Sequence, residues 1–511
     1  MLLSTVVFLP ILFTLVLLAI PNPRMLRTMA LTFSIIEFVF SLSILSHYNS
    51  ASPALQFVEQ YNWIERFGIT YFLGVDGISI WLVILTTFLM PIIILASWNS
   101  VDKGIKGFHV ALFVLQSAML GSFLALDAIL FYLFWELSLV PMFFIVGIWG
   151  GKNRIYATTK FFIFTMAGSV LMLVAMIYLM YLTQDATGKM SASILDFYKL
   201  NLPFVEGEFR NSIQTMLFFA FSIAFAIKVP MFPVHSWLPD AHVEAPTPGS
   251  VILAGVMLKM GTYCFLRWVI PLFPQAADSF SWVFLFLGVA GIIYGALVAM
   301  VQPDIKKLVA YSSVSHMGYI MLGLFVFNSA GISGGLLQML NHGISTGALF
   351  LLIGMIYERT HSREIKSYGG LAGVLPVYTI LFFIVTLSSI AVPLTNGFVG
   401  EFMILLGTYT AKPAYAYFAV TGVVLGAAYM LWMFKRVFFG EKGPLVSDAH
   451  HPLHDLSARE IVVMVPLIFL VFWMGLFPNQ ILDVSKSSIE NLVKNRTKYS
   501  LEVQFGRQGG Q

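Results

Sequence analysis

Long, uninterrupted apolar runs constrain this chain more than any other feature of its sequence. The first lies at residues 2–20, and similar runs recur along most of the 511 residues. A bilayer core about 30 Å thick is crossed by about 20 apolar residues in a helix. Charged residues make up only 11% of the chain, whereas soluble domains carry about 25%. The runs therefore predict membrane-spanning helices, and the composition excludes an ordinary soluble domain.

A scan for such runs predicts an all-α polytopic membrane protein with about 14 transmembrane helices. The first run lacks a basic region and a small-residue cleavage site, so it is expected to be a retained helix rather than a signal peptide. No helix is predicted in the polar, basic tail after the last run. The predicted spans lie near 2–20, 28–47, 74–98, 108–126, 128–149, 159–182, 213–235, 249–270, 280–301, 308–328, 333–357, 375–407, 414–434 and 461–478.

The basic residues provide an independent check on this topology. With the N-terminus outside, sixteen Lys and Arg residues fall in or beside the inner loops. Leaving the C-terminal tail aside, five fall in the outer loops: Arg66, Lys189, Lys199, Arg210 and Lys412. An excess of Lys and Arg marks the cytoplasmic side. We therefore expect both termini to face outward, away from the cytoplasm.

Two predicted spans contain a proline break, IKVPMFP at 227–233 and AVPLTNG at 391–397. Proline removes a backbone donor and clashes with the preceding turn. In lipid such a break is tolerated only where the freed groups face protein or water. The broken helices are the seventh and twelfth spans, five apart, and this pattern favours two inverted five-helix repeats. The predicted organisation is 1–107 for helices 1–3, 108–273 for the first repeat (helices 4–8), 274–438 for the second repeat (helices 9–13), and 439–511 for a loop, helix 14 and the tail.

Six ionisable residues inside the predicted spans are candidates for a functional role. A charged side chain at mid-bilayer costs about 2.5–3.5 kcal/mol even on lenient scales, and such groups usually mark ion pathways. A lysine at depth loses solvation of its charged form, and a nearby carboxylate favours that form again, so a lysine–glutamate pair could act as a gate. Histidine relays protons near neutral pH. The alternative is that these groups only pair and hold helices together. They are Glu136, Lys228, Lys259, His316, His342 and Glu401.

The sequence contains little that could hold a cofactor. Its single cysteine, Cys264, excludes internal disulfides, cysteine-ligated zinc and iron–sulfur clusters within the chain. No Gly-rich dinucleotide motif or P-loop is present. We therefore expect no cofactor and no metal here, and any redox chemistry must take place in a partner.

The remaining polar groups are interpreted without a functional role. A histidine-containing loop is expected to be solvated rather than to bind a metal, although it has candidate ligands at Asp448, His450, His451, His454 and Asp455. Four charged residues are placed near helix ends, at the interface or snorkelling towards it. These are Glu37, Asp76, Asp127 and Arg267.

Two long motifs resemble a known family. The first is KVPMFPVHSWLPDAH at 228–242, which continues with EAPT at 244–247 and KMG at 259–261. The second is QPDIKKLVAYSSVSHMG at 302–318. Both resemble the signature of the large antiporter-like subunits, which include complex I subunits L, M and N and the Mrp-type cation/proton antiporters. The resemblance covers essentially the whole chain. Within the family, the chain looks most like the M-type branch. This resemblance rests on residues 248–263 and on a glutamate at 401, where many relatives have lysine.

The resemblance implies roles for all six buried residues. Glu136 and Lys228 would be the proton-handling pair, Lys259 the central link, His316 and His342 the relays, and Glu401 the outer acid. The chain ends after helix 14, so it is expected to lack the long lateral helix of the L-type subunit.

The resemblance also implies that the chain moves protons as a translocase subunit of NADH:quinone oxidoreductase. Its partners would be L- and N-type subunits in the lipid bilayer, with flavin, iron–sulfur clusters and quinone in partner subunits and no nucleic acid. The alternatives are a subunit of an Mrp-type sodium/proton antiporter, the equivalent subunit of a related hydrogenase or ferredoxin-linked complex, and a structural spacer.

Overall fold

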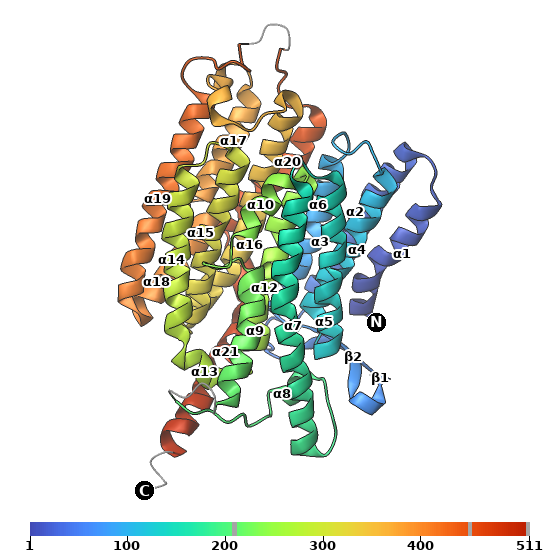
Figure 1. Cartoon of the computed structure of the whole chain (residues 1–511), viewed down its shortest axis with the longest axis vertical. Helices are drawn as coiled ribbons and strands as arrows, with labels where there is room; N and C mark the ends of the chain where they lie inside the picture. The colour runs from blue at the N-terminus through green and yellow to red at the C-terminus, as the bar shows by residue number, and fades with distance from the viewer. Residues whose placement is uncertain (207–211, 448–451, 507–511) are drawn as a thin grey trace.

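The computed structural model describes residues 1–206, 212–447 and 452–506, with side chains up to Arg496. Within these ranges, twelve helices are long and apolar enough to cross a membrane. Most run along the long axis of the molecule (Figure 1). They are α1 (Leu2–Ala19), α2 (Pro23–Ser46), α3 (Ser79–Ala96), α4 (Ile105–Leu124), the joined α5 (Ala128–Leu137) and α6 (Leu139–Trp149), α7 (Arg154–Thr187), a continuous segment from α11 to η3 (Thr247–Val269), α14 (Ser281–Met300), α15 (Ile305–Phe325), α16 (Ser329–Thr360), α19 (Pro413–Phe438) and α20 (Ala458–Leu476).

The first predicted break is present. Helix α9 (Ile213–Lys228) ends one residue before Val229, and the chain resumes as α10 (Trp237–Glu244). The break contains two prolines, which cannot donate to a continuing helix. The indole of Trp237 donates to the carbonyl of Ile227 at 2.8 Å, so a side chain satisfies an acceptor that the broken helix leaves free.

The second predicted break is present as well. Helix α17 (Pro376–Ser389) stops before Val392-Pro393, and α18 (Asn396–Ala411) follows. The Ser388 hydroxyl donates to the Asn396 side chain at 2.6 Å and so ties the two half-helices together. The predicted spans 213–235 and 375–407 are thus interrupted helices. The mostly helical polytopic fold is confirmed, while the number fourteen stays a prediction.

One of the most buried spans has an irregular backbone. Between Thr247 and Val269 the chain passes from α11 (Thr247–Ile252) through a π-helical turn, η2 (Leu253–Met257), into α12 (Leu258–Cys264) and a second π turn, η3 (Phe265–Val269). Wide turns of this kind are rare and concentrate at functional sites. The turn η2 lies directly before Lys259.

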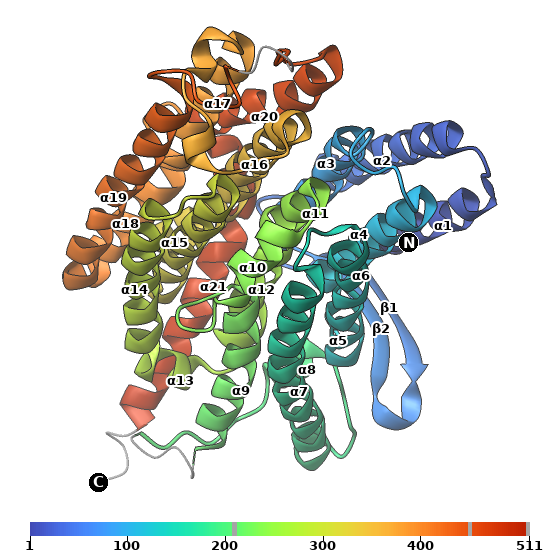
Figure 2. The same cartoon turned by 45° about the horizontal axis from the view of Figure 1, so that its top comes forward.

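Two strands and three helices described here were not predicted. The loop after α2 folds into an antiparallel hairpin of β1 (Gln56–Ile64) and β2 (Ile69–Val75), so the third span starts at Ser79 and not at 74. Two short helices, α8 (Ile194–Phe197) and α13 (Pro274–Ser279), lie at the lower end in Figure 1. The polar tail forms a helix, α21 (Asn479–Gly506), which packs against α16 and α13 (Figure 2).

The centre of the bundle is formed by the Thr247–Val269 segment, α15 and α16, whose apolar stretches are almost wholly covered by other helices. By contrast, α1, α2, α7 and α19 leave most of their apolar surface exposed, as lipid-facing helices do. Helices α16 and α18 approach closely at Gly334, where an added Cβ would lie 2.7 Å from the backbone nitrogen of Ile404. Small residues permit such contacts between membrane helices.

Candidate functional site

Lys228 is the last residue of α9, at the first break, and is 1% exposed. Its ammonium donates to the hydroxyl of Ser138 at 3.3 Å and lies 5.0 Å from the centre of the Trp135 ring. Ser138 joins α5 to α6, two residues after Glu136. Glu136 forms no ion pair with Lys228 within 4 Å, but the two charges interact, and one carboxylate oxygen is buried without a hydrogen bond. Both groups therefore lie in one polar region between α5, α6 and α9.

Lys259 lies at the start of α12 and is fully buried. Its nitrogen is 2.7 Å from Nδ1 of His342 on α16, and it also donates to the carbonyl of Ala254. That carbonyl belongs to the π turn before Lys259. An ammonium has only donors, so Nδ1 of His342 must be the acceptor while the lysine is charged. The remaining proton of a neutral His342 then sits on Nε2.

His316 on α15 and Glu401 on α18 form the next contact. Nδ1 of His316 lies 2.9 Å from a carboxylate oxygen of Glu401, and the Gln338 amide donates to the same oxygen at 3.0 Å. Asn341 donates to the Gln338 side chain at 3.2 Å and to the Asn396 carbonyl at 2.7 Å, where α18 begins. The second broken helix thus helps to position this acid.

The two histidines face each other across a small polar cavity. Their ring centres are 5.8 Å apart, and both Nε2 atoms are buried with no hydrogen-bond partner among the described residues. The cavity has a volume of about 10 Å³, on the order of the space that one water molecule needs. It is lined by His316, Gln338, Asn341, His342, Ser345, Thr346, Ser388, Ser389 and Gly397.

The six predicted residues thus fall into two groups. Lys259, His342, His316 and Glu401 form one row, and Glu136 and Lys228 form a separate pair. No hydrogen bond or ion pair in the described part of the chain connects Lys228 with Lys259. Their helices do touch, because α12 packs against the end of α9, where a Cβ on Gly261 would lie 2.9 Å from the Val229 nitrogen.

The sequence analysis missed two buried groups near Lys259. His242 is fully buried in α10, with neither ring nitrogen hydrogen-bonded, and it interacts electrostatically with Lys259 and Lys306. Lys306 donates to the carbonyl of Ala245 at 2.6 Å and lines a cavity of about 640 Å³. This cavity opens among loops that the basic residues assign to the inner side. His242 belongs to the motif after the first break, and that position was the available signal.

The interpretation of Glu37 as a residue near a helix end is wrong. It lies well inside α2, is 0% exposed, and has no hydrogen bond on either carboxylate oxygen. The residue is buried within the bundle instead of facing lipid or the interface, on a helix that packs against α1, α3 and α4. Asp127 does lie at a helix end, where it caps α5. Asp76 and Arg267 also lie near helix ends, but they form an ion pair at 2.5 Å and do not snorkel separately.

Part of the histidine-containing loop lies outside the described residues, namely Asp448, His450 and His451. Of the rest, the Asp455 carboxylate accepts the backbone N–H groups of Val377 and Tyr378 at the start of α17. Among the described residues, no group of three His, Cys, Asp or Glu side chains could hold a metal ion.

A helical membrane protein with two proline-broken helices and buried acid–base contacts beside them belongs to the class of ion-translocating membrane proteins. Residues 125–426 match the family model described as "NADH:quinone oxidoreductase/Mrp antiporter, TM". Residues 5–126 match "NADH-ubiquinone oxidoreductase chain 4, amino terminus". The chain belongs to the NADH:quinone oxidoreductase/Mrp antiporter family.

Individual relatives are similar over nearly their full length. The chain is 46% identical to NADH-quinone oxidoreductase subunit M of Rhodobacter capsulatus, covering 97% of this chain and 96% of the relative. Its structure is similar to a chain of respiratory complex I from Thermus thermophilus with bound NADH, with TM-score 0.86, 30% identity and coverage of 97% and 100%. It also shares the fold of a chain of the Mrp complex from Dietzia sp. DQ12-45-1b, with TM-score 0.83, 20% identity and coverage of 96% and 98%.

Proposed function

We propose that this chain is an antiporter-like membrane-arm subunit of NADH:quinone oxidoreductase that translocates protons, and that its buried acid–base row carries them. The observation that carries the proposal is the pair of contacts Lys259–His342 and His316–Glu401, which face each other across a polar cavity inside the helix bundle. The similarity to subunit M over nearly the whole chain supports the same function.

The hydrogen bonds of the row give it a direction. A charged Lys259 can pass a proton to Nδ1 of His342, which then holds protons on both nitrogens. His342 can release the Nε2 proton towards Nε2 of His316 through one water in the cavity between them. Nε2 of a neutral His316 is an acceptor because its Nδ1 donates to the Glu401 carboxylate. The proton on Nδ1 can then pass to Glu401. Each step moves one proton between named atoms.

Glu136 and Lys228 would control this route. A carboxylate favours the charged form of a neighbouring lysine, so a change in their separation changes how tightly Lys228 holds its proton. Lys228 lies at a helix break and bonds to Ser138 rather than to Glu136. In this proposal the Glu136 carboxylate moves towards or away from the ammonium. Moving a proton against the membrane potential costs about 2.3 kcal/mol per 100 mV, so the route needs such a gate.

The redox reaction belongs to partner subunits in this proposal. Flavin, iron–sulfur clusters and quinone would be held there, next to L- and N-type antiporter-like neighbours in the membrane arm. The chain is thus a subunit of the enzyme without a redox site of its own. Copurification tests this part: the solubilised chain is expected to elute with flavin and iron–sulfur absorbance, and elution without either would contradict it.

We propose a bacterial inner membrane as the location, with both termini on the periplasmic side. The basic loops support this orientation. The proposed units are 1–107, two inverted repeats at 108–273 and 274–438, and 439–511. The two broken helices, α9–α10 and α17–α18, occupy equivalent positions in these repeats and support the division.

Glu136→Gln tests the gate directly. The substitution keeps the shape of the side chain and removes its charge, so Lys228 loses the carboxylate that favours its protonated form. NADH-driven acidification of inverted membrane vesicles is expected to fall by about 10²-fold, the lower range for a positioned acid–base group. Glu136→Asp should retain much of it. Glu441→Gln, at an exposed position, is the matched control. Normal acidification in Glu136→Gln would contradict the assignment.

A further inference from the structure

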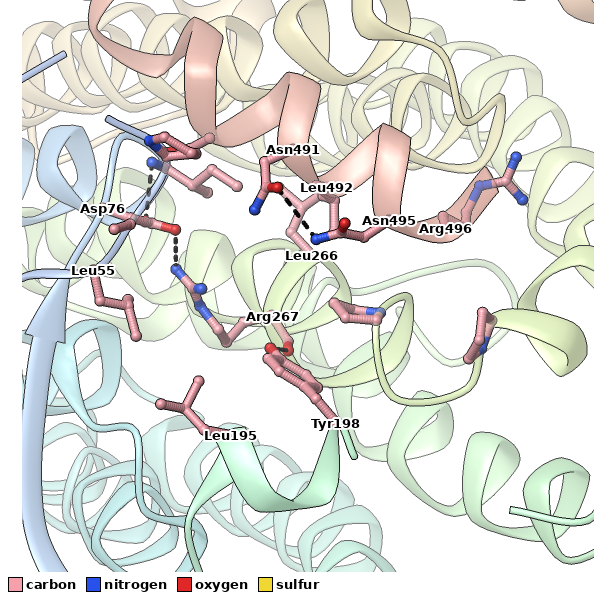
Figure 3. A pocket seen from close by; sticks show the side chains of 16 residues that line it. Leu55, Asp76, Leu195, Tyr198, Leu266, Arg267, Asn491, Leu492, Asn495 and Arg496 are labelled. Atoms are coloured by element: carbon pink, nitrogen blue, oxygen red, sulfur yellow. Dashed lines mark hydrogen bonds and ion pairs between the residues drawn. The ribbon is translucent and has the colours of Figure 1, made fainter. Parts of the chain in front are cut away.

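A cavity of about 570 Å³, seen from close by in Figure 3, opens near α8 and α13, which lie at the lower end of Figure 1. The loops around it fall on the side that the basic residues assign to the outside. Helix α21 forms one wall with Asn491 and Asn495, and α8 contributes Leu195. The inner wall is formed by the end of the Thr247–Val269 segment, with Leu266 and Arg267. The helix that carries Lys259 therefore ends in this cavity.

Arg267 is held firmly in that wall. Its guanidinium is 2.5 Å from the Asp76 carboxylate, as Figure 3 shows, and its Nε donates to the Tyr263 hydroxyl at 3.1 Å. The carboxylate also accepts the backbone N–H groups of Ile78 and Ser79. Burial by itself would raise the pKa of Asp76, but Arg267 and these backbone groups outweigh it and hold that pKa below its usual range. The pair is therefore ionised at neutral pH.

Arg267 lies two turns beyond Lys259 on the same helix, with Tyr263 between them. Eight residues of helix span about 12 Å. Side chains on a helix lean towards its N-terminus, and Arg267 accordingly reaches back one turn to the Tyr263 hydroxyl. That hydroxyl in turn donates to the Phe123 carbonyl at 2.8 Å. Along this helix, the Tyr263 hydroxyl and the Arg267 guanidinium therefore lie between the central lysine of the row and a cavity open to the outside.

We propose that Arg267 is an electrostatic seal that stops protons on Lys259 from leaving through this cavity, so that they pass to His342 instead. The inference rests on the proposed function. Arginine keeps its charge at all relevant pH values. Relative to its position on Lys259 at about 12 Å, a proton that approaches Arg267 to about 6 Å on its way to the cavity meets additional repulsion. At an effective dielectric constant of about 20, this repulsion lowers the occupancy of the proton on the exit path about tenfold. Arg267 is a positioning residue, because it acts on the route of the proton without carrying it.

Arg267→Gln in the assembled complex tests the seal. Glutamine keeps a side chain that can hydrogen-bond to Asp76 and Tyr263 but removes the charge. In proteoliposomes without NADH, an imposed pH gradient is expected to decay about tenfold faster than with the unaltered complex. NADH:quinone turnover should persist while protons moved per NADH fall. Arg267→Lys should restore the tight membrane. Arg66→Met, on the exposed hairpin turn of the same face, is the matched control.

Asp76→Asn distinguishes an electrostatic seal from a simple tie, that is, an ion pair that only holds α3 against the helix of Lys259. A tie needs both partners, so Asp76→Asn and Arg267→Gln would leak equally, and that result would overturn the proposal. A seal needs only the positive charge, so Asp76→Asn is expected to stay tight. If the complex with Arg267→Gln fails to assemble, the decay of the imposed pH gradient is measured with Arg267→Met instead. If an uncharged Arg267 variant keeps the pH gradient as long as the unaltered complex does, the seal is refuted. The proposed function would not be affected by that result, because the Lys228 and Glu136 variants test it separately.

Discussion

Lys228→Ala is expected to abolish quinone-coupled proton pumping, with a loss of about 10²-fold or more in the acidification of inverted vesicles. The substitution removes the basic group that interacts with Glu136 at the first break and leaves the Ser138 hydroxyl without its donor. The complex should still assemble, because Lys228 makes no ion pair within 4 Å that holds helices together. Native gel electrophoresis measures assembly, and a pH-sensitive dye measures pumping.

Lys228→Arg shows what the lysine contributes. Arginine keeps the positive charge but does not release a proton. If Lys228 exchanges a proton, the arginine variant should pump as poorly as the alanine variant. Recovery of pumping in Lys228→Arg would mean that a fixed charge suffices and that the side chain only pairs. Lys412→Ala, on an exposed loop, is the control expected to pump normally.

Lys259→Met is expected to have the second large effect. Methionine has a similar length and suits the dry surroundings, but it removes the group that faces Nδ1 of His342 at 2.7 Å. Without a donor there, the histidine row receives no proton, and pumping should fall by about 10²-fold. NADH-driven acidification and native gels again measure the two outcomes. Here the structure should tolerate the change, since transferring a charge out of the bilayer core is favourable.

His342→Gln extends this test along the row. Glutamine keeps a hydrogen-bonding side chain beside Lys259 but cannot relay a proton, so it should resemble Lys259→Met. His47→Gln, on an exposed position, is the matched control. Full pumping in both Lys259→Met and His342→Gln would show that protons take another route.

The sequence predicted the helices and their breaks well because both have local causes. A run of about 20 apolar residues has one stable form in lipid, and prolines in 227–233 and 391–397 interrupt a helix wherever it lies. Helix α21 was missed because a polar helix has no hydropathy signal, although one of its faces packs against α16. The hairpin was missed because the search was limited to long apolar runs.

The contacts of the site could not be predicted in the same way. His342 and Lys259 are 83 residues apart, and His316 and Glu401 are 85 residues apart. Their meeting depends on how α12, α15, α16 and α18 are rotated and shifted against one another. Glycines such as Gly334 determine that packing. No local sequence pattern indicates which side chains the packing brings within 3 Å of each other. The residues could be nominated, but their order along the row came from the structure.

The wide turn before Lys259 has a consequence for the alignment of this helix. A π turn accommodates one residue more than the α-helical turn it replaces. If Leu253–Met257 adopted regular α geometry with no residue removed, the helix beyond it would be rotated by about 100° and advanced by about 1.5 Å. Lys259 would then face away from α16, so the wide turn determines which neighbour this lysine meets. Deleting one residue within Leu253–Met257 would give a regular helix in which Lys259 keeps both its depth and its present facing.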